Sequence, residues 1–202
     1  MHGVMKNATS GLGEWQMHGD WQIRPARPDE AALLPAVEEA SGTLFRTIPD
    51  LAWIADDGVM PAEAHLAAIA AGTCWVAVEG EAVAGFLSAR MAGEDGNGAD
   101  AGRAVLHVWE MSVAPAHQGR GLGRALLEHA AAYAAAQAMA AVTLTTFRDV
   151  AWNAPFYART GFAILPDVAL TPRLRDVLAA EVAHGLPAAR RCAMRRPVSL
   201  VS

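Results

Sequence analysis

The sequence predicts an α/β domain with a mixed sheet, and three observations lead to this prediction. Short apolar or alternating stretches typical of strands are interleaved with longer stretches of helical periodicity along the whole chain. In the central part a strand, a glycine-rich loop, a helix and another strand follow one another, which is typical of a parallel strand pair joined by a right-handed crossover. The 202 residues, 53% hydrophobic and 18% charged, suffice for one domain with a buried core.

The N-terminal half is expected to hold three strands and two helices. Pro25 stops the first strand, and Asp29 is of the residue type that caps a helix N-terminus. In order, the expected elements are a strand at 21–24, a helix after Asp29, an irregular, aromatic and acidic segment at 43–58, a helix from Pro61 to Gly72, two strands within 74–90 that meet in a turn at 79–81, and a polar, mobile, glycine-rich loop at 93–102.

The C-terminal half is expected to alternate between strands and helices. Its longest helix is indicated by four residues that share one face at helical spacing, namely Leu122, Leu126, Ala130 and Tyr133. In order, the expected elements are a strand ended by Pro115, this helix, a β-branched strand at 142–147, a short helix capped by Asn153 and ended by Gly161, an extended segment at 162–165, a helix from Thr171-Pro172 to Gly185, and a closing strand at 192–198.

Composition also limits the cellular setting and the partners. The formal net charge of −5 provides no broad basic surface, so nucleic acid is not an expected partner. Cys74 and Cys192 are isolated and form no CxxC motif, which fits a reducing cytoplasm. No apolar run is long enough to span a membrane, and residues 1–19 lack the apolar centre of a signal peptide. We therefore expect a flexible tail at 1–19 and a single cytoplasmic domain at 20–198.

The glycine loop HQGRGLGRALL at 117–127 looks like a seat for phosphate. Glycines let backbone N–H groups approach an anion, and the N-terminus of the following helix favours negative charge. The loop lacks the Gly-Lys-Ser/Thr ending of a P-loop, and Arg124 stands where the dinucleotide pattern needs its third glycine. The loop is then either an anion site of another kind, with Arg120 and Arg124 as further ligands, or only a tight strand-to-helix turn.

Two stretches in this region carry a family resemblance. The run 113–127 resembles the acetyl-CoA-binding motif of the GNAT superfamily of N-acetyltransferases, with Gln118, Gly119, Gly121 and Gly123 at the motif positions. About thirty residues later, NAPFYARTGF at 153–162 is similar to the second signature of that family, in which a helix carrying a tyrosine precedes Gly-Phe. The resemblance covers about residues 20–198 and implies a bacterial member of the family.

The resemblance implies a strongly bent mixed sheet whose two middle strands splay apart, with the pantetheine arm of acetyl-CoA in the gap. The backbone at Met111, Ser112 and Val113 would pair with the pantetheine amides, and Asn153 would contact the cofactor from the other side. The residues implied to hold the pyrophosphate are Gln118, Gly119, Arg120, Gly121, Leu122, Gly123 and Arg124.

Acetyl transfer to an amine needs a base, because an alkylamine with a pKa near 10.4 is protonated at neutral pH. Glu110 is the candidate base; in a regular strand it shares a face with Val108 and Ser112, and burial would raise its pKa. Tyr157 matches the tyrosine of the second signature and is the candidate acid for the leaving thiolate, as well as a cofactor contact. The alternatives are a structural ion pair for Glu110 and plain core packing for Tyr157.

Other candidate groups are weaker. His107 would more simply be a structural strand histidine than a second base, and His117 would lie near the adenine or the phosphates. A main-chain N–H near Val113 would stabilise the oxyanion. No His, Cys, Asp or Glu cluster has metal-ligand spacing, so no metal is expected.

The acceptor side is the least determined part of the sequence. Phe45, Trp53 and Asp149 are the candidate substrate contacts, and an acidic, aromatic surface would suit a cationic amine, although a solvated acidic loop has the same composition. Further candidates are Arg46, Asp50, Asp56, Asp57, Phe147 and Arg148. The helix at 172–184 would be an addition that covers the acceptor cleft or a dimer contact.

The expected function is acetyl transfer from acetyl-CoA to the primary amine of a small molecule by direct attack on the thioester. The first alternative is acetylation of a protein or peptide amine. The second alternative is a non-catalytic module that only binds acyl-CoA. A homodimer is a frequent assembly of the resembled family.

Overall fold

A computed structural model describes residues 16–18, 21–93 and 102–198 of the chain. It contains one eight-stranded sheet with the strand order β1-β2-β3-β4-β5-β6-β8-β7. The strands are β1 (Gln16–His18), β2 (Trp21–Pro25), β3 (Cys74–Glu79), β4 (Ala82–Gly93), β5 (Ala104–Val113), β6 (Ala141–Phe147), β7 (Ala163–Ile164) and β8 (Arg191–Pro197). Neighbouring strands run antiparallel except β5 and β6, which run parallel, so the predicted mixed α/β fold is confirmed.

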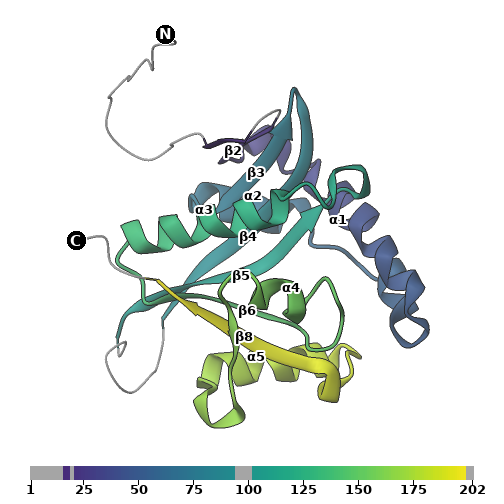
Figure 1. Cartoon of the computed structure of the whole chain (residues 1–202), viewed down its shortest axis with the longest axis vertical. Coiled ribbons are helices and arrows are strands. Elements are labelled where there is room, and N and C mark those ends of the chain that lie inside the picture. Colours follow the sequence, from purple (N-terminus) through teal and green to yellow (C-terminus); the bar gives the residue numbers. More distant parts are fainter. Residues whose placement is uncertain (1–15, 19–20, 94–101, 199–202) are drawn as a thin grey trace.

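Helices cover both faces of this sheet (Figure 1). The α-helices are α1 (Leu34–Gly42), α2 (Ala62–Ala70), α3 (Leu122–Ala136), α4 (Ala154–Ala158) and α5 (Pro172–Ala183). Short 3₁₀ helices are η1 (Pro28–Glu30), η2 (Thr43–Thr47), η3 (Pro49–Asp56), η4 (Pro115–His117), η5 (Asp167–Ala169) and η6 (Ala188–Arg190). The central unit β5–loop–α3–β6 therefore has the order expected from the sequence.

Side chains of β3 alternate between two apolar cores, as the period of a strand requires. Trp75 and Ala77 belong to the main core, which α3 covers, whereas Val76 and Val78 belong to a second core on the face of α1 and α2. On β6, Leu144 packs in the main core and Thr145 contacts α5. α1, α2 and α5 thus share the face opposite α3.

The two middle strands separate part of the way along their length. β5 and β6 pair at Val105↔Ala141, Leu106↔Val142 and His107↔Thr143, and within the described residues their register ends there. On its other edge β5 stays paired with β4, but Ser88 pairs with Glu110 and Ala89 with Val108, so a bulge leaves Trp109 as an extra residue. Because a bulge bends and twists its strand, it turns the end of β5 away from β6.

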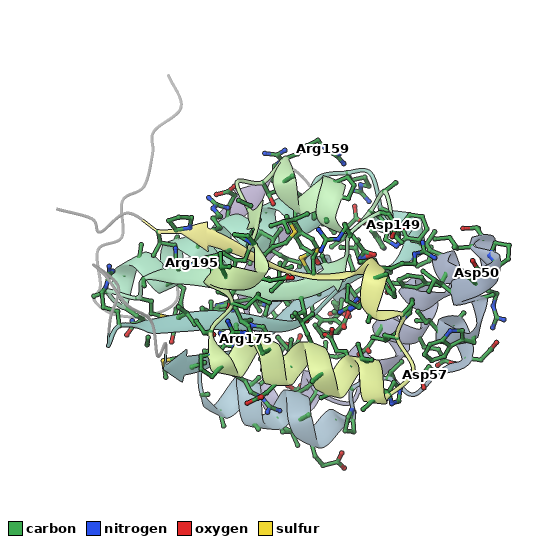
Figure 2. All side chains as sticks on the ribbon, turned by 90° about the horizontal axis from the view of Figure 1, so that it is seen from below. Asp50, Asp57, Asp149, Arg159, Arg175 and Arg195 are labelled. Atoms are coloured by element: carbon green, nitrogen blue, oxygen red, sulfur yellow. The ribbon has the colours of Figure 1, made fainter. Side chains whose placement is uncertain are left out.

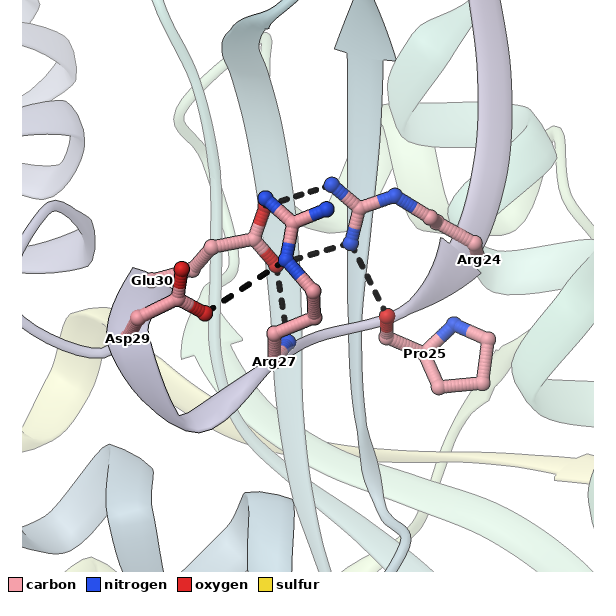
Figure 3. Close-up of polar contacts among 5 residues, drawn as sticks. All are labelled: Arg24, Pro25, Arg27, Asp29 and Glu30. Carbon is pink, nitrogen blue, oxygen red and sulfur yellow. Dashed lines mark hydrogen bonds and ion pairs between the residues drawn. The ribbon is translucent and has the colours of Figure 1, made fainter.

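The first α-helix begins later than expected. Asp29 lies in η1 and does not cap a long helix; α1 starts at Leu34. Pro35 explains the difference, because its missing N–H is tolerated only in the first turn of a helix. The guanidinium of Arg24 donates hydrogen bonds to both carboxylate oxygens of the neighbouring Glu30, and the one to Oε2 measures 2.7 Å. The backbone N–H of Arg27 donates to the same Oε2 at 2.7 Å (Figure 3).

Part of the segment expected as an N-terminal tail, 1–19, forms a strand. Residues Gln16–His18 form β1 and pair with β2 in the register Gln16↔Ile23, while residues 1–15 lie outside the described residues. Most of the expected loop at 93–102 also lies outside them, at 94–101. The segment at 43–58, expected to be irregular, instead forms the 3₁₀ helices η2 and η3. The other expected elements are present, and Thr171 caps α5 by accepting a hydrogen bond from the backbone N–H of Leu174 at 3.4 Å.

Candidate active site

A cavity of about 720 Å³ lies where β5 and β6 separate. It is lined by the ends of both strands, by the glycine loop and the start of α3, by α4, and by residues of α1, η2, η3 and α5. Glu110 and Tyr157, predicted from separate parts of the sequence, both line it. The cavity has one end at the glycine loop and another beneath η2, η3 and α5.

At the first end, the glycine loop turns directly into α3. Gly119 and Gly121 have φ angles of +75° and +90°, a region that favours glycine. Gly121 is the N-cap of α3, so the N–H groups of the first helical turn have no intrahelical acceptors and point toward the cavity end of the helix. Gln118 fixes the loop to β5, because its Nε2 donates to the backbone oxygen of Val113 at 2.9 Å. This arrangement is suited to bind phosphate oxygens.

The two arginines of this loop have different roles. Arg124 lines the cavity and donates to the backbone oxygen of Arg159 at 3.1 Å. Arg120 is not among the described lining residues; its guanidinium forms an ion pair with Glu79 at 2.7 Å, and His117 approaches the same carboxylate at 3.0 Å. The side chain of Arg120 is thus paired with Glu79 and not among the described residues that line the cavity, and its predicted contact with the phosphates stays a prediction.

Asn153 lies opposite the glycine loop, at the start of α4. Its backbone oxygen accepts hydrogen bonds from the N–H groups of Phe156 and Tyr157 at 2.8 and 3.0 Å, but its side chain does not cap the helix. Asn153 lines the cavity, and its side-chain oxygen Oδ1 is buried and has no hydrogen-bond partner among the described residues. A buried acceptor without a donor is costly, so a ligand amide or hydroxyl at this position would satisfy it.

Glu110 occupies the bend of β5 and is half-buried, with its open side toward the cavity. Ser112 Oγ donates to Glu110 Oε1 at 2.8 Å, and Ser41 Oγ of α1 lies 2.9 Å from Ser112 Oγ. Glu110 shares a face with Ser112 as expected, but not with Val108, which packs in the α3 core; the bulge at Trp109 breaks the alternation. Burial raises the pKa of Glu110.

Glu38 of α1 is a second carboxyl group near Glu110, and it was not among the residues predicted from the sequence. Burial and the negative charge of Glu110 raise the pKa of Glu38 to about 8. Both of its carboxylate oxygens accept from the backbone N–H of Met60, at 3.1 and 3.2 Å. A signal was present in the sequence, because Glu38 and Ser41 follow the buried Leu34 at the spacing of a helix stripe that faces the sheet.

Tyr157 of α4 is buried and packs edge-to-face against Phe156 and Phe162, with ring centroids 5.3 and 5.8 Å apart. Burial and the nearby charge of Glu110 raise the pKa of its phenol. The group is therefore protonated at neutral pH and is able to donate a proton into the cavity.

His107 is buried at the last position of β5 that pairs with β6. Its Nδ1 lies 2.9 Å from Thr143 Oγ1, and burial together with the charge of Arg173 lowers the pKa of His107 to about 3. It lines the cavity as a neutral imidazole. The structural role expected for it is consistent with these contacts.

The second end of the cavity contains one of the three predicted acceptor contacts. Phe45 lines it and packs against Phe147 and Trp152, with centroids 5.5 and 5.8 Å away. Trp53 and Asp149 do not line the cavity: Trp53 is partly exposed beside His184, and Asp149 forms an ion pair with Arg190 at 2.9 Å on the surface. We therefore do not retain Trp53 and Asp149 as direct acceptor contacts.

Of the further acidic and basic candidates, Asp57 lines the cavity, whereas Asp50, Asp56, Arg46 and Arg148 are not among the described lining residues. Figure 2 shows Asp57 beside the end of α5 and Asp50 farther out on the same side of the molecule. Asp56 instead forms an exposed ion pair with Arg46 at 2.6 Å.

α5 and β8 contribute polar lining residues that were not predicted from the sequence. Glu181 of α5 forms a bidentate ion pair with Arg191 of β8, at 2.8 and 2.9 Å, and Thr145 Oγ1 donates to Glu181 Oε1 at 2.5 Å. His184 Nε2 lies 2.7 Å from Asp57 Oδ2. The helix expected as an addition, α5, thus covers the second end of the cavity.

The described residues were also compared with the requirements of a metal site and of a membrane-spanning helix. Within residues 16–18, 21–93 and 102–198, no group of three or more His, Cys, Asp and Glu side chains is placed to hold a metal ion. In the same ranges, none of the helices has both the length and the apolar character needed to cross a membrane.

Several known structures share this fold, and two of those compared below contain coenzyme A or acetyl-CoA. The fold resembles the PaiA N-acetyltransferase from Thermoplasma acidophilum in complex with coenzyme A, with a TM-score of 0.58, 14% identity and coverage of 88% of this chain and 98% of that one. A GNAT family acetyltransferase from Brucella melitensis in complex with acetyl-CoA gives a TM-score of 0.52 and 27% identity, covering 72% and 84%. The ribosomal-protein-S18-alanine N-acetyltransferase from Escherichia coli gives 0.56 and 14%, covering 90% and 96%.

The family follows from the sequence match and the site together. The profile of the acetyltransferase (GNAT) family matches residues 36–162, which is more than half of the chain and includes Glu110, the glycine loop and Tyr157. The glycine loop at the start of α3, the gap between β5 and β6 and the unpaired Asn153 oxygen fit the phosphates and amides of coenzyme A. The chain belongs to the GNAT family of acetyltransferases, and acetyl-CoA is its acyl-donor cosubstrate.

Proposed function

We propose that the protein acetylates the primary amine of a small molecule by direct attack of the amine on the thioester of acetyl-CoA. One observation carries this proposal. Glu110 and Tyr157 line a single cavity at the point where β5 and β6 separate, between the glycine loop and an acceptor end of different chemistry. Acetyl transfer requires one group that accepts a proton and one that donates a proton, and Glu110 and Tyr157 would fill these two roles.

The donor end is assigned to the glycine loop and its neighbours. The backbone N–H groups from Gln118 to Arg124 would hold the pyrophosphate, with the Arg124 side chain beside them. Past His107, the edge of β5 that faces the gap is available to the pantetheine amides, and Asn153 Oδ1 would accept from the opposite side. Bound there, acetyl-CoA supplies an activated acetyl group.

Proton transfer is assigned to Glu110 and Tyr157. The acceptor enters as an ammonium ion and gives a proton to Glu110, whose raised pKa makes it a stronger base than an exposed carboxylate. As the new N–C bond forms and the C–S bond breaks, the Tyr157 phenol gives its proton to the sulfur, and the second proton that the nitrogen loses on becoming an amide restores the phenol. Glu110 then releases the first proton to solvent. Ser112 holds Glu110 through the 2.8 Å hydrogen bond and keeps the carboxylate directed into the cavity.

A bridge across the acceptor end supports a small acceptor over a peptide. The 2.7 Å contact between His184 and Asp57 joins the end of α5 to the segment after η3, and the ring of Trp53 packs beside His184 with centroids 6.3 Å apart. A peptide chain would have to displace this bridge to reach Glu110. The E. coli relative named for ribosomal-protein S18 shares only the fold at 14% identity, so a protein acceptor is the second candidate.

Kinetics of two conservative variants test the assignment. We expect Tyr157→Phe to lower kcat about 100-fold with an unchanged Kd for acetyl-CoA, since only proton donation is lost. We expect Glu110→Gln to lower activity similarly, with a remaining rate that rises about tenfold per pH unit as more of the amine becomes neutral.

The matched controls are Tyr133→Phe and Glu128→Gln. Tyr133 of α3 packs against Trp75 of β3, and Glu128 forms a surface ion pair with Arg196. Both controls should keep wild-type rates. Wild-type turnover of an accepted amine by Tyr157→Phe and Glu110→Gln would refute the assigned roles.

A further inference from the structure

The acceptor end of the cavity has apolar walls and three carboxylates. The apolar lining residues come from four separate segments of the chain and are Leu44, Phe45, Ile54, Phe147, Trp152 and Leu186. The carboxylates that line the whole cavity are Asp57, Glu110 and Glu181. The charge that each carboxylate can offer to a substrate depends on what already binds it.

Two of the three carboxylates are already bound by side chains of other residues, Glu181 by Arg191 and Asp57 by His184. Glu181 is held by both arms of Arg191 at 2.8 and 2.9 Å, and by the Thr145 hydroxyl. Asp57 is hydrogen-bonded by His184, and this bond lowers the pKa of Asp57. A cationic substrate group at either site would have to replace a partner that is already in place.

Glu110 differs from the other two carboxylates in the groups that bind it. Ser112 and the backbone N–H of Met111 bind it, and it forms no ion pair with any residue of the described part of the chain. It is therefore the one carboxylate of the cavity free to receive an ammonium group, and it lies beside the acetyl-transfer site. A second ammonium group on the same acceptor would be placed among apolar and aromatic side chains, where losing its hydration is costly.

An acceptor carboxylate is also disfavoured. Arg191 is the cation at the acceptor end, and besides binding Glu181 its guanidinium lies 4.6 Å from the centre of the Phe147 ring. A carboxylate next to the reacting amine would lie near Glu110 and repel it. Aromatic side chains at both Phe45 and Trp152 instead offer contacts to a ring.

We propose that the acceptor is a monoamine, an alkylamine or arylalkylamine whose only charge is the reacting ammonium group, and that the paired states of Glu181 and Asp57 exclude polyamines and amino acids. This inference rests on the proposed function and names the substrate class of the same site. It is a statement of selectivity, because it compares acceptors that differ by a single charge.

The test compares matched acceptors with the full-length protein and acetyl-CoA. Hexylamine is paired with 1,6-diaminohexane, which adds one cation, and phenethylamine is paired with phenylalanine, which adds one carboxylate. Release of the CoA thiol gives kcat/KM, and mass spectrometry identifies the acetylated product. We expect the monoamine of each pair to be preferred at least about tenfold, the effect of one unfavourable charged contact. Equal or reversed preference in either pair would overturn the inference.

A variant tests the assigned cause. Glu181→Gln keeps a polar partner for Thr145 but releases the charge of Arg191, so the ratio of phenylalanine to phenethylamine turnover should rise. Leu66→Ala, on the exposed side of α2 and away from the cavity, should leave both ratios unchanged. An unchanged ratio in Glu181→Gln would also overturn the inference.

The outcomes separate this inference from the proposed function. If no amine is acetylated above the hydrolysis background although acetyl-CoA binds, the proposed function fails and the inference falls with it. If a peptide N-terminus is acetylated better than every small amine, the small-molecule acceptor fails. If small amines are acetylated but the dication or the amino acid matches its monoamine partner, only the inference fails.

Discussion

At the scale of single residues, the least expected feature is the pair of carboxyl groups on α1 and β5. Glu38 has a pKa of about 8 because it is removed from water and lies near the charge of Glu110. The two groups therefore titrate as a pair, and the negative charge of Glu110 raises the pKa of Glu38. This arrangement gives α1 a direct electrostatic influence on the candidate base.

Glu38 should also make folding stability depend on pH. A carboxyl group whose pKa is higher in the folded than in the unfolded state stabilises the fold fully below the unfolded pKa, near 4.5, and this contribution is lost as the pH rises through about 8. We expect Glu38→Gln to reduce the fall in Tm between pH 5 and 9, although Glu110 leaves part of it. The adjacent and exposed Glu39→Gln is the control and should retain the wild-type slope. Parallel Tm profiles for Glu38→Gln and the wild type would contradict this account.

At the scale of elements, the turn from the glycine loop into α3 combines backbone geometry with ligand binding. Gly121 has a φ of +90° and open space where a Cβ would be, so a substitution there is unfavourable through backbone conformation alone. The same geometry directs the first N–H groups of α3 into the donor end of the cavity. Stability and cofactor binding are thus linked at one residue.

Gly121→Ala should therefore lower both properties. We expect a loss of about 1–2 kcal/mol in the free energy of unfolding, measured in urea, and a weaker Kd for acetyl-CoA by calorimetry. Gly42→Ala is the matched control, because Gly42 ends α1 with a negative φ and also has open space around it. That change should be neutral or stabilising by up to about 1 kcal/mol. Equal effects of the two substitutions would argue against backbone strain at Gly121.

At the scale of the whole molecule, the cavity depends on segments that are far apart in the sequence. Ser41 and Ser112, whose hydroxyls are 2.9 Å apart, are separated by 71 positions. The Asp57–His184 contact joins residues 127 positions apart. A ligand that contacts several of these segments stabilises the folded state as a unit, since the unfolded chain has no such site.

Thermal stability should consequently report cofactor binding. At 100 times its Kd, acetyl-CoA contributes about 2.7 kcal/mol, which corresponds to a rise in Tm of about 5–10 °C for a domain of this size. Arg124→Ala should reduce this shift because Arg124 lines the cavity, whereas Arg120→Ala should preserve it because that side chain pairs with Glu79. A larger loss of the shift in Arg120→Ala than in Arg124→Ala would instead support the direct phosphate role expected for Arg120.

The sequence by itself determined the mixed α/β fold, the family and the donor acetyl-CoA. These depend on features encoded in short stretches: the positive φ angles of Gly119 and Gly121, the helix that follows them, and a second signature around Tyr157. Backbone preferences of neighbouring residues are sufficient to specify such features, so they can be recognised without knowing what packs against them.

Only the tertiary structure decided how the candidate site is completed. The bulge at Trp109 separated Glu110 from the face of Val108, and the packing of α1 brought Glu38 beside Glu110. The packing of α5 placed Glu181 against Arg191 at the acceptor end and left Trp53 outside the cavity. The approach of Glu38 to Glu110 results from the packing of segments that are far apart in the sequence, and the Glu181–Arg191 pair forms because α5 folds back onto β8. Local backbone preferences do not specify how such elements pack against one another.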